Sequence, residues 1–130
     1  MEELLEKLIE DCSVYTRLGC VADYIPELSK ADPNEIGVHI ITSDGRHSWA
    51  GDHETRFTIQ SIVKPILLLQ ASLRFELAYR RRAELGRIMA VVPTRMGIGI
   101  NSPALNTKGN SVAGIQLLEK LSQQLYLSIF

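Results

Sequence analysis

Apolar residues recur at helical spacing at the start of the chain. Those on one face are Leu4, Leu5, Leu8, Ile9 and Cys12, and charged residues fill the opposite face. This pattern predicts an amphipathic helix that ends near Gly19. Residues 20–35 contain Pro26 and Pro33, which favour turns over a long helix, so they are expected to form a connector packed through Val21, Tyr24, Ile25 and Leu28.

Alternating patterns then predict strands. The runs IGVHIIT and RHSWAG flank Asp44-Gly45, a dipeptide typical of tight hairpin turns. A second pair, RIMAVVP and RMGIGIN, is separated by Pro93, Thr94 and Arg95. In the last run Gly97 and Gly99 share a face, which we expect a helix to approach closely.

Two further helices are predicted. The first begins at Ser61, where the sequence becomes rich in Leu, Ala, Arg and Glu, and Gly86 offers a stop. A continuous helix would be long, at about 25 residues, so a break or a strand between Arg74 and Arg82 is an alternative. The second follows a cap at Asn110 or Ser111.

The order of elements predicts one domain, residues 1–130, of the α/β (α+β) class. About five antiparallel strands form its sheet, and helices pack on the sheet, with the terminal helices paired on one face. The chain has 130 residues, of which 45% are hydrophobic, which suits a single core.

The net charge and the cysteine content argue against several classes of function. The formal net charge of −1 provides no field for holding nucleic acid. Neither Cys12 nor Cys20 belongs to a CxxC pair, so no zinc site, disulfide scaffold or cofactor is predicted. The acidic amino terminus is unlike a secretory signal, and no apolar run reaches the ~20 residues that span a bilayer. A cytoplasmic protein without a membrane partner is expected.

Ser61 and Lys64 form an SxxK pattern where the chain turns helical. Positions i and i+3 are neighbours on a helix, so the Lys64 amine can reach the Ser61 hydroxyl. The positive helix terminus would stabilise an oxyanion beside Ser61 and favour a neutral Lys64 amine, the form that acts as a base. The alternative is a capping serine followed by an exposed lysine.

The histidines and an arginine-rich segment are the other candidates for a binding site. His39, His47 and His53 give no HxH or HxxxH spacing, so they do not predict a metal site. Residues 74–87 contain five Arg against two Glu, which favours a solvated helix face over an anion site.

The sequences around the SxxK pattern resemble serine-dependent glutaminases, whose fold is related to serine β-lactamases and penicillin-binding proteins. Residues 1–72, with VADYIPELSKADPNEIGVHIITSDG and FTIQSIVK, resemble the amino-terminal part. Residues 88–130, with AVVPTRMGIGINSPALNTKGNSVAGIQLLEKLS, resemble the carboxy-terminal part. The resemblance implies Ser61 as nucleophile, Lys64 as base and L-glutamine as substrate.

The junction at residues 73–87 departs from the family. The resemblance implies a large helical lobe there, supplying Asn, Glu and Tyr side chains, of which Tyr79 is at most a remnant. The family's Lys-Ser-Gly and following glycine-rich stretch are replaced by RRAELGR, residues 81–87, which we expect to be helical. Of the glycine-rich stretch whose backbone donor completes the family's oxyanion hole, only Gly86 is left.

The resemblance and the departure at residues 73–87 together suggest two alternative functions. The first is a truncated, engineered and catalytically inactive glutaminase-like scaffold; a natural paralogue that lost its lobe would give the same sequence. The alternative is a residual glutaminase that hydrolyses L-glutamine to L-glutamate and ammonia through Ser61 and Lys64. Loss of a lobe exposes apolar surface, so a homodimer is one expectation.

Overall fold

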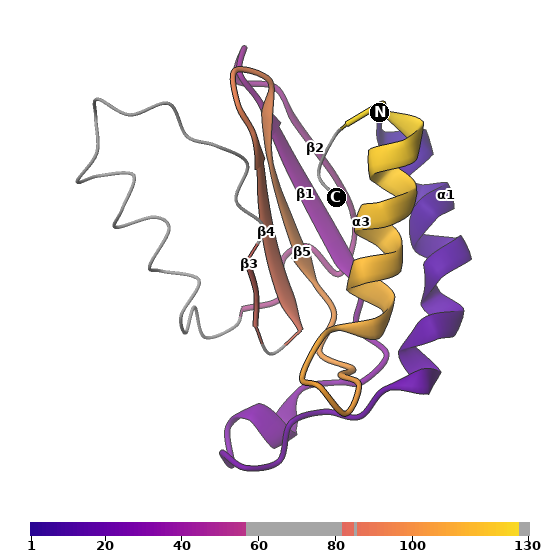
Figure 1. Ribbon diagram of the computed structural model, residues 1–130, viewed down its shortest axis with the longest axis vertical. Coiled ribbons are helices and arrows are strands. Elements are labelled where there is room, and N and C mark those ends of the chain that lie inside the picture. The colour runs from indigo at the N-terminus through magenta and orange to yellow at the C-terminus, as the bar shows by residue number, and fades with distance from the viewer. Residues whose placement is uncertain (57–81, 85, 128–130) are drawn as a thin grey trace, which may run out of the picture.

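The computed structural model describes residues 1–56, 82–84 and 86–127. The helices are α1 (Glu2–Ser13), α3 (Val112–Gln124) and the 3-10 helices η1 (Val14–Leu18) and η2 (Leu28–Lys30). The strands are β1 (Gly37–Thr42), β2 (His47–Gly51), β3 (Arg82–Glu84), β4 (Arg87–Val92) and β5 (Met96–Asn101). They form one antiparallel sheet in the order β2-β1-β5-β4-β3 (Figure 1). The predicted fold class is therefore confirmed.

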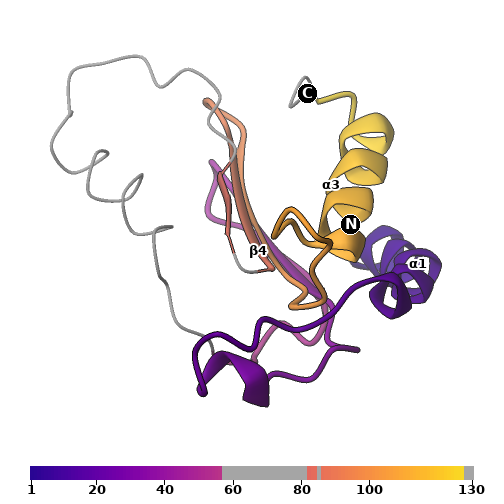
Figure 2. The same ribbon diagram turned by 60° about the horizontal axis from the view of Figure 1, so that its bottom comes forward.

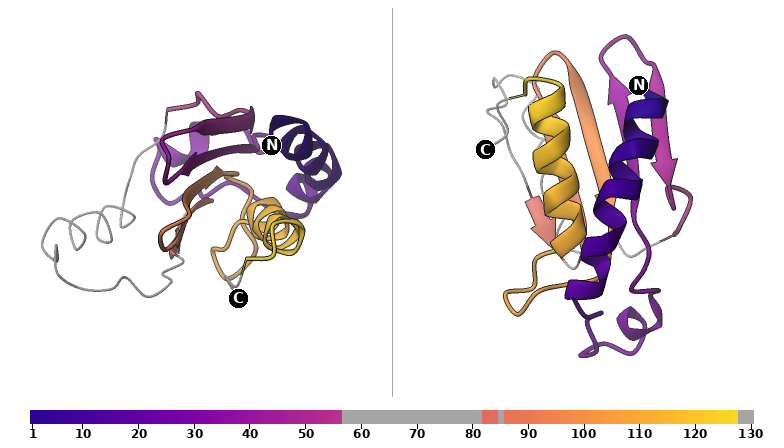
Figure 3. Two further views of the ribbon diagram at one scale, coloured as in Figure 1. Left: turned by 90° about the horizontal axis from the view of Figure 1, so that it is seen from above. Right: turned by 90° about the vertical axis from the view of Figure 1, so that its right-hand side faces the viewer.

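The core lies between the sheet and two helices. Helices α1 and α3 lie side by side over one sheet face, as the sequence predicts for the terminal helices (Figure 3). The aliphatic side chains between the two layers are almost fully buried: Leu5, Leu8, Val38, Ile40, Ile88, Ala90, Ile98, Ile100, Leu117, Leu118 and Leu121. Their removal from water stabilises the layer by about 25 cal/mol per Å² of apolar area.

Local hydrogen bonds fix the turns and helix ends. Gly45 adopts φ +81° in the β1–β2 turn, and the Thr42 N–H donates to the Arg46 carbonyl at 2.9 Å, so the predicted hairpin forms. Ser111, one of the two predicted caps, accepts from the Gly114 N–H at 3.0 Å. The first α-helix ends at Ser13, before the predicted boundary, and tightens into η1.

The glycines of β5 face away from α1 and α3. Strand alternation directs Ile98 and Ile100 toward these helices, and a Cβ built at Gly97 would have no atom of the described residues within 4 Å. Neither α1 nor α3 therefore lies on the glycine face, and the close approach of a helix to that face stays a prediction. Close approach occurs on the isoleucine face because hydrophobic burial selects it.

Residues 82–84 form strand β3, contrary to the expectation of a helix. Their helix-forming composition predicts a helix, but Ala83 pairs with Ile88 in an antiparallel ladder. Pairing with β4 overrides intrinsic helix propensity, which amounts to less than about 1 kcal/mol per residue. Gly86 accordingly lies in the turn before β4, with φ +84°, and does not end a helix.

The connector between α1 and β1 lies at the end of the sheet where β4 begins (Figure 2). It packs mainly through Leu28, which is 5% exposed, whereas Tyr24 is 66% exposed, contrary to its predicted packing role. In the portion of the chain that the structure describes, the helices are too short or too polar to cross a membrane.

Candidate functional site

The two predicted catalytic residues lie outside the described residues. Ser61 and Lys64 fall within residues 57–81, as does Tyr79. Arg56 is the last described residue before them, and β3 begins after them. The described site is therefore built from the residues that lead into and out of this segment.

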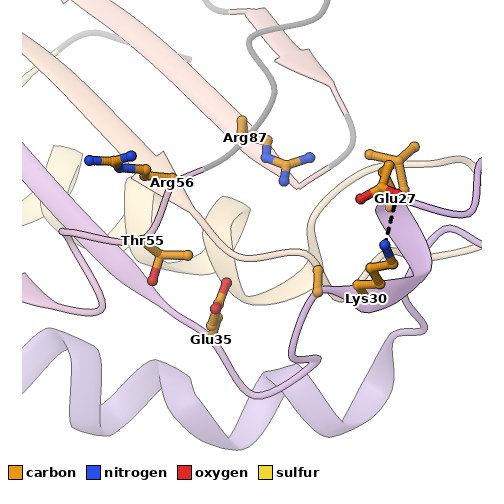
Figure 4. Close-up of a pocket in the computed structure, with 8 residues that line it drawn as sticks. Glu27, Lys30, Glu35, Thr55, Arg56 and Arg87 are labelled. Atoms are coloured by element: carbon orange, nitrogen blue, oxygen red, sulfur yellow. Dashed lines mark hydrogen bonds and ion pairs between the residues drawn. The ribbon is translucent and has the colours of Figure 1, made fainter.

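A hollow of about 430 Å³ opens beside Arg56 at the end of the sheet (Figure 4). It is lined by Glu27, Leu28, Lys30, Ala31, Glu35, Thr55, Arg56 and Arg87. Three parts of the chain supply these side chains: the connector around η2, the segment after β2 and the first residue of β4. Most of the lining is charged, with both signs present.

Arg87 forms the inner wall of this hollow. It is 7% exposed and opens β4, where it pairs with Asn101 of β5. The preceding turn is held by the Ser102 N–H, which donates to the Gly86 carbonyl at 2.7 Å. Burial lowers the pKa of the Arg87 guanidinium, and the nearby Glu35 carboxylate raises it in part. An arginine keeps its charge in proteins, so the wall is cationic.

Glu35 supplies an anionic side chain to the hollow, and hydrogen bonds hold this residue in place. The Asn101 Nδ2 donates to its Oε2 at 3.3 Å, and its own backbone N–H donates to the Asp32 carbonyl at 3.1 Å. The adjacent residue, Ile36, is tied to Asp52 by the Ile36 N–H, which donates to Oδ2 at 3.1 Å. These bonds fix the carboxylate beside the start of β4.

The remaining charges lie nearer the rim. The Lys30 Nζ and Glu27 Oε1 are 2.7 Å apart, and both side chains are about 70% exposed (67% and 71%). Such an exposed pair stabilises a protein by about 0–1 kcal/mol. The Arg56 side chain is exposed and also lines the hollow.

Local sequence patterns do not predict this arrangement of charged residues. The predicted strand RIMAVVP begins at Arg87, as β4 does. The predicted solvated helix face is wrong for Arg87, which is buried because β4 pairs with β5 and places it opposite Asn101. Glu35 and Arg56 were not singled out, and no local motif links them. The antiparallel β1–β5–β4 register, which is a long-range feature, brings Glu35 close to Arg87.

A histidine and tryptophan cluster lies on the sheet face opposite α1 and α3. The β1–β2 hairpin places His39 Nε2 and His47 Nδ1 3.1 Å apart, within hydrogen-bond distance. His39 also meets the edge of Trp49, which stacks on His53. Within residues 1–56, 82–84 and 86–127, no three His, Cys, Asp or Glu side chains gather as metal ligands.

Acidification is expected to destabilise the fold partly through His39. Burial, followed by the charges of His47 and His53, lowers the pKa of His39 below its ordinary value of 6.5. The unfolded chain therefore takes up this proton first, so the stabilising contribution is complete above about pH 6.5 and is lost as the pH falls below it. Thermal unfolding at pH 7.5 and 5.5 should show a smaller difference for His39→Gln than for the unsubstituted chain.

The exposed Gln123→Ala change on α3 is the control for this titration and should leave the pH dependence unaltered. An unchanged pH dependence in His39→Gln would show that His39 contributes nothing to it.

Comparison with known proteins places the chain among enzymes of one family. The family profile described as Glutaminase matches residues 19–79 and 85–130. A glutaminase of Fusobacterium nucleatum is 52% identical over 73 residues, which cover 56% of this chain and 24% of that protein. A glutaminase of Clostridium tetani is 52% identical over 71 residues, covering 55% and 23%. The chain thus spans about a quarter of the length of the curated relatives it matches.

Solved structures share the fold at low sequence identity. A probable glutaminase from Bacillus subtilis, complexed with 6-diazo-5-oxo-L-norleucine, superposes with a TM-score of 0.83 at 17% identity, covering 99% of this chain and 97% of that one. Mglu in its glutamate form gives a TM-score of 0.82 at 15% identity, covering 100% and 70%. Since the family profile matches most of the sequence and the architecture agrees, the chain belongs to the glutaminase family.

Proposed function

We propose that this chain is a minimal glutaminase sheet layer that carries the Ser61–Lys64 pair but does not turn over glutamine by itself. The observation that supports it is the junction between the two matched segments, which are separated only by residues 80–84. There the described chain forms the β3–β4 hairpin with the buried Arg87, in place of the family's glycine-rich stretch. In this proposal residues 1–72 and 88–130 supply the layer and residues 73–87 join them.

Hydrolysis of glutamine requires more than the Ser61–Lys64 pair. Ser61 Oγ would attack the carboxamide carbon of glutamine while Lys64 accepts the hydroxyl proton, then returns a proton to the departing ammonia. Water would hydrolyse the resulting glutamyl ester to glutamate. Orientation of the substrate by a second wall contributes effective molarities of up to ~10⁵ M or more, and residues 80–84 are too few to supply a lobe.

A residual glutaminase is the second candidate. It is favoured by the first matched segment, residues 19–79, which includes both Ser61 and Lys64 within FTIQSIVK. The Bacillus subtilis glutaminase YbgJ forms a covalent complex with 5-oxo-L-norleucine by reaction with 6-diazo-5-oxo-L-norleucine. The same reagent can therefore report whether Ser61 of this chain is nucleophilic, independently of turnover.

The test measures ammonia release from L-glutamine and covalent labelling in parallel. We expect release at the rate of the buffer alone, both in the unsubstituted chain and in Ser61→Ala. Intact-mass measurement after incubation with 6-diazo-5-oxo-L-norleucine is expected to show no adduct that Ser61→Ala removes. Ser61-dependent release on the order of 1 s⁻¹, an ordinary enzyme rate, would overturn the inactive scaffold in favour of the residual glutaminase.

A further inference from the structure

We propose that the β1–β2 hairpin binds a divalent transition-metal ion of the Ni²⁺, Cu²⁺ or Zn²⁺ class between His39 Nε2 and His47 Nδ1. These two nitrogen atoms lie 3.1 Å apart on the sheet face opposite α1 and α3. Water completes the coordination shell, because two histidines supply only part of the roughly four to six ligands that such ions take. Neither ligand belongs to the segment that holds Ser61 and Lys64, so the inference does not rest on glutamine hydrolysis.

Strand pairing brings the two histidines together. Strands β1 and β2 are neighbours at one end of the strand order (Figure 1). His39 faces Trp49 across their ladder and His47 faces Ile41, so the two imidazoles are diagonal neighbours on one face. The pair is eight positions apart in the sequence, where a search for HxH or HxxxH spacing does not find it. The ladder, and not a short motif, sets the distance between the rings.

The distance between the two nitrogen atoms suits one shared ion. A metal–imidazole bond is ~2.0–2.1 Å long, so nitrogen atoms 3.1 Å apart subtend an angle of about 100° at a common ion. This angle lies between the ~90° of square-planar or octahedral coordination and the ~109° of a tetrahedral site. The ion lies to one side of the line between the nitrogens, and the exposed His47 ring can pivot to direct its lone pair there.

Both rings can present a lone pair to the ion without a net loss of protons. A neutral imidazole carries one proton, and the ion requires it on His39 Nδ1 and on His47 Nε2. The proton that now joins the two rings in their hydrogen bond therefore moves to the outer nitrogen of its own ring. Burial, followed by the charges of His47 and His53, lowers the pKa of His39 below 6.5, so this ligand is neutral at pH 7.5.

The neighbouring residues orient His39 and add no bulk beside it on β5. Trp49 meets the His39 ring edge-on, with 5.7 Å between the ring centroids, and stacks on His53. Gly99 faces His39 across the β1–β5 ladder, so this strand places no side chain directly opposite the imidazole. The aromatic contacts thus hold the first ligand in place before the ion binds, which reduces the ordering that binding requires.

The test titrates the chain with NiCl₂ at pH 7.5 and follows the fluorescence of Trp49, the one tryptophan of the sequence. A Ni²⁺ ion on His39 lies close to the indole and quenches its emission. We expect saturable quenching with a Kd on the order of 10–100 µM. Addition of roughly 10 mM Mg²⁺ should leave the curve unchanged, because Mg²⁺ prefers oxygen ligands. Absence of saturation up to about 1 mM Ni²⁺, or relief of the quenching by Mg²⁺, would overturn the proposal.

His47→Asn separates metal binding from the hydrogen bond. The Asn amide nitrogen stands where His47 Nδ1 does, one bond from Cγ, so it can still donate to His39 Nε2 but offers no imidazole lone pair. This variant should raise the Kd for Ni²⁺ at least about tenfold while its free energy of unfolding changes by no more than about 0.5 kcal/mol. The matched control is His53→Asn, whose amide can donate to the Gly51 carbonyl as the His53 ring does. It should change the Kd by less than about twofold.

The variants also exclude other positions for the ion. An unchanged Kd in His47→Asn, or an equal loss of affinity in His53→Asn, would overturn the assignment to the His39–His47 pair. Cys20→Ser removes an exposed thiol that could compete for the metal and should bind Ni²⁺ as the unsubstituted chain does. Loss of binding there, or in Ser61→Ala, would place the ion at the thiol or at the predicted catalytic segment and overturn the hairpin site. Retained binding in both variants, together with its loss in His47→Asn, supports the site whether or not glutamine is hydrolysed.

Discussion

Leu118→Ala is expected to lower the free energy of unfolding by about 2–5 kcal/mol. Leu118 lies on α3, is 0% exposed and belongs to the core cluster between the helices and the sheet. Truncation removes its apolar contacts and leaves a cavity that two packed helices cannot readily close. For a domain of this size, the melting temperature should fall by roughly 10 °C or more.

Glu119→Ala is the control, because it changes the adjacent exposed residue of the same helix. Surface substitutions of this kind are usually within about 0.5 kcal/mol of neutral. Urea unfolding of both variants measures the difference. Similar losses in the two variants would mean that α3 is not packed on the sheet as the structure has it.

Periodicity predicts the parts of this fold that depend on local sequence. Helical spacing identified α1 and the helix capped by Ser111, and alternation identified both hairpins, because one side of each element is buried in the core. The orientation of β5 was not predicted. Either face of MGIGIN could receive a helix on steric grounds, and only the burial of Ile98 and Ile100 decides between them.

The charged hollow could not be predicted from local sequence patterns. Glu35, Arg56 and Arg87 are far apart in the sequence, and each alone resembles a surface residue. The helix-forming composition of residues 82–84 does not predict β3, and the alternative strand between Arg74 and Arg82 overlaps it only at Arg82. The pairing of β3 with β4 depends on a partner strand and not on its own propensity. Ser61 and Lys64 were found because their spacing is local, and their roles stay predictions.

The turn before β4 connects the fold to this hollow. Gly86 precedes Arg87, and its carbonyl accepts the Ser102 N–H at 2.7 Å. A shift in this turn would move the start of β4, and with it the guanidinium that forms the inner wall. The stability of the β3–β4 hairpin and the shape of the hollow are therefore expected to change together.

Gly86→Ala is expected to be strongly destabilising, by about 2–6 kcal/mol. Its φ of +84° is a conformation that an alanine adopts only with strain of about 1–3 kcal/mol. A Cβ there would also overlap the Ser102 carbonyl oxygen and the Pro103 Cα. Both contacts are with backbone, which can yield only by shifting, and overpacking of this kind costs about another 1–3 kcal/mol.

Gly45→Ala separates the two effects. Gly45 has a similar φ of +81°, but a Cβ there would meet no atom of the part of the chain that the structure describes within 4 Å, so Gly45→Ala should lose only the conformational part. The free energy of unfolding, measured with urea, should therefore be much lower for Gly86→Ala than for Gly45→Ala. Equal losses would show that the turn tolerates a side chain against β5.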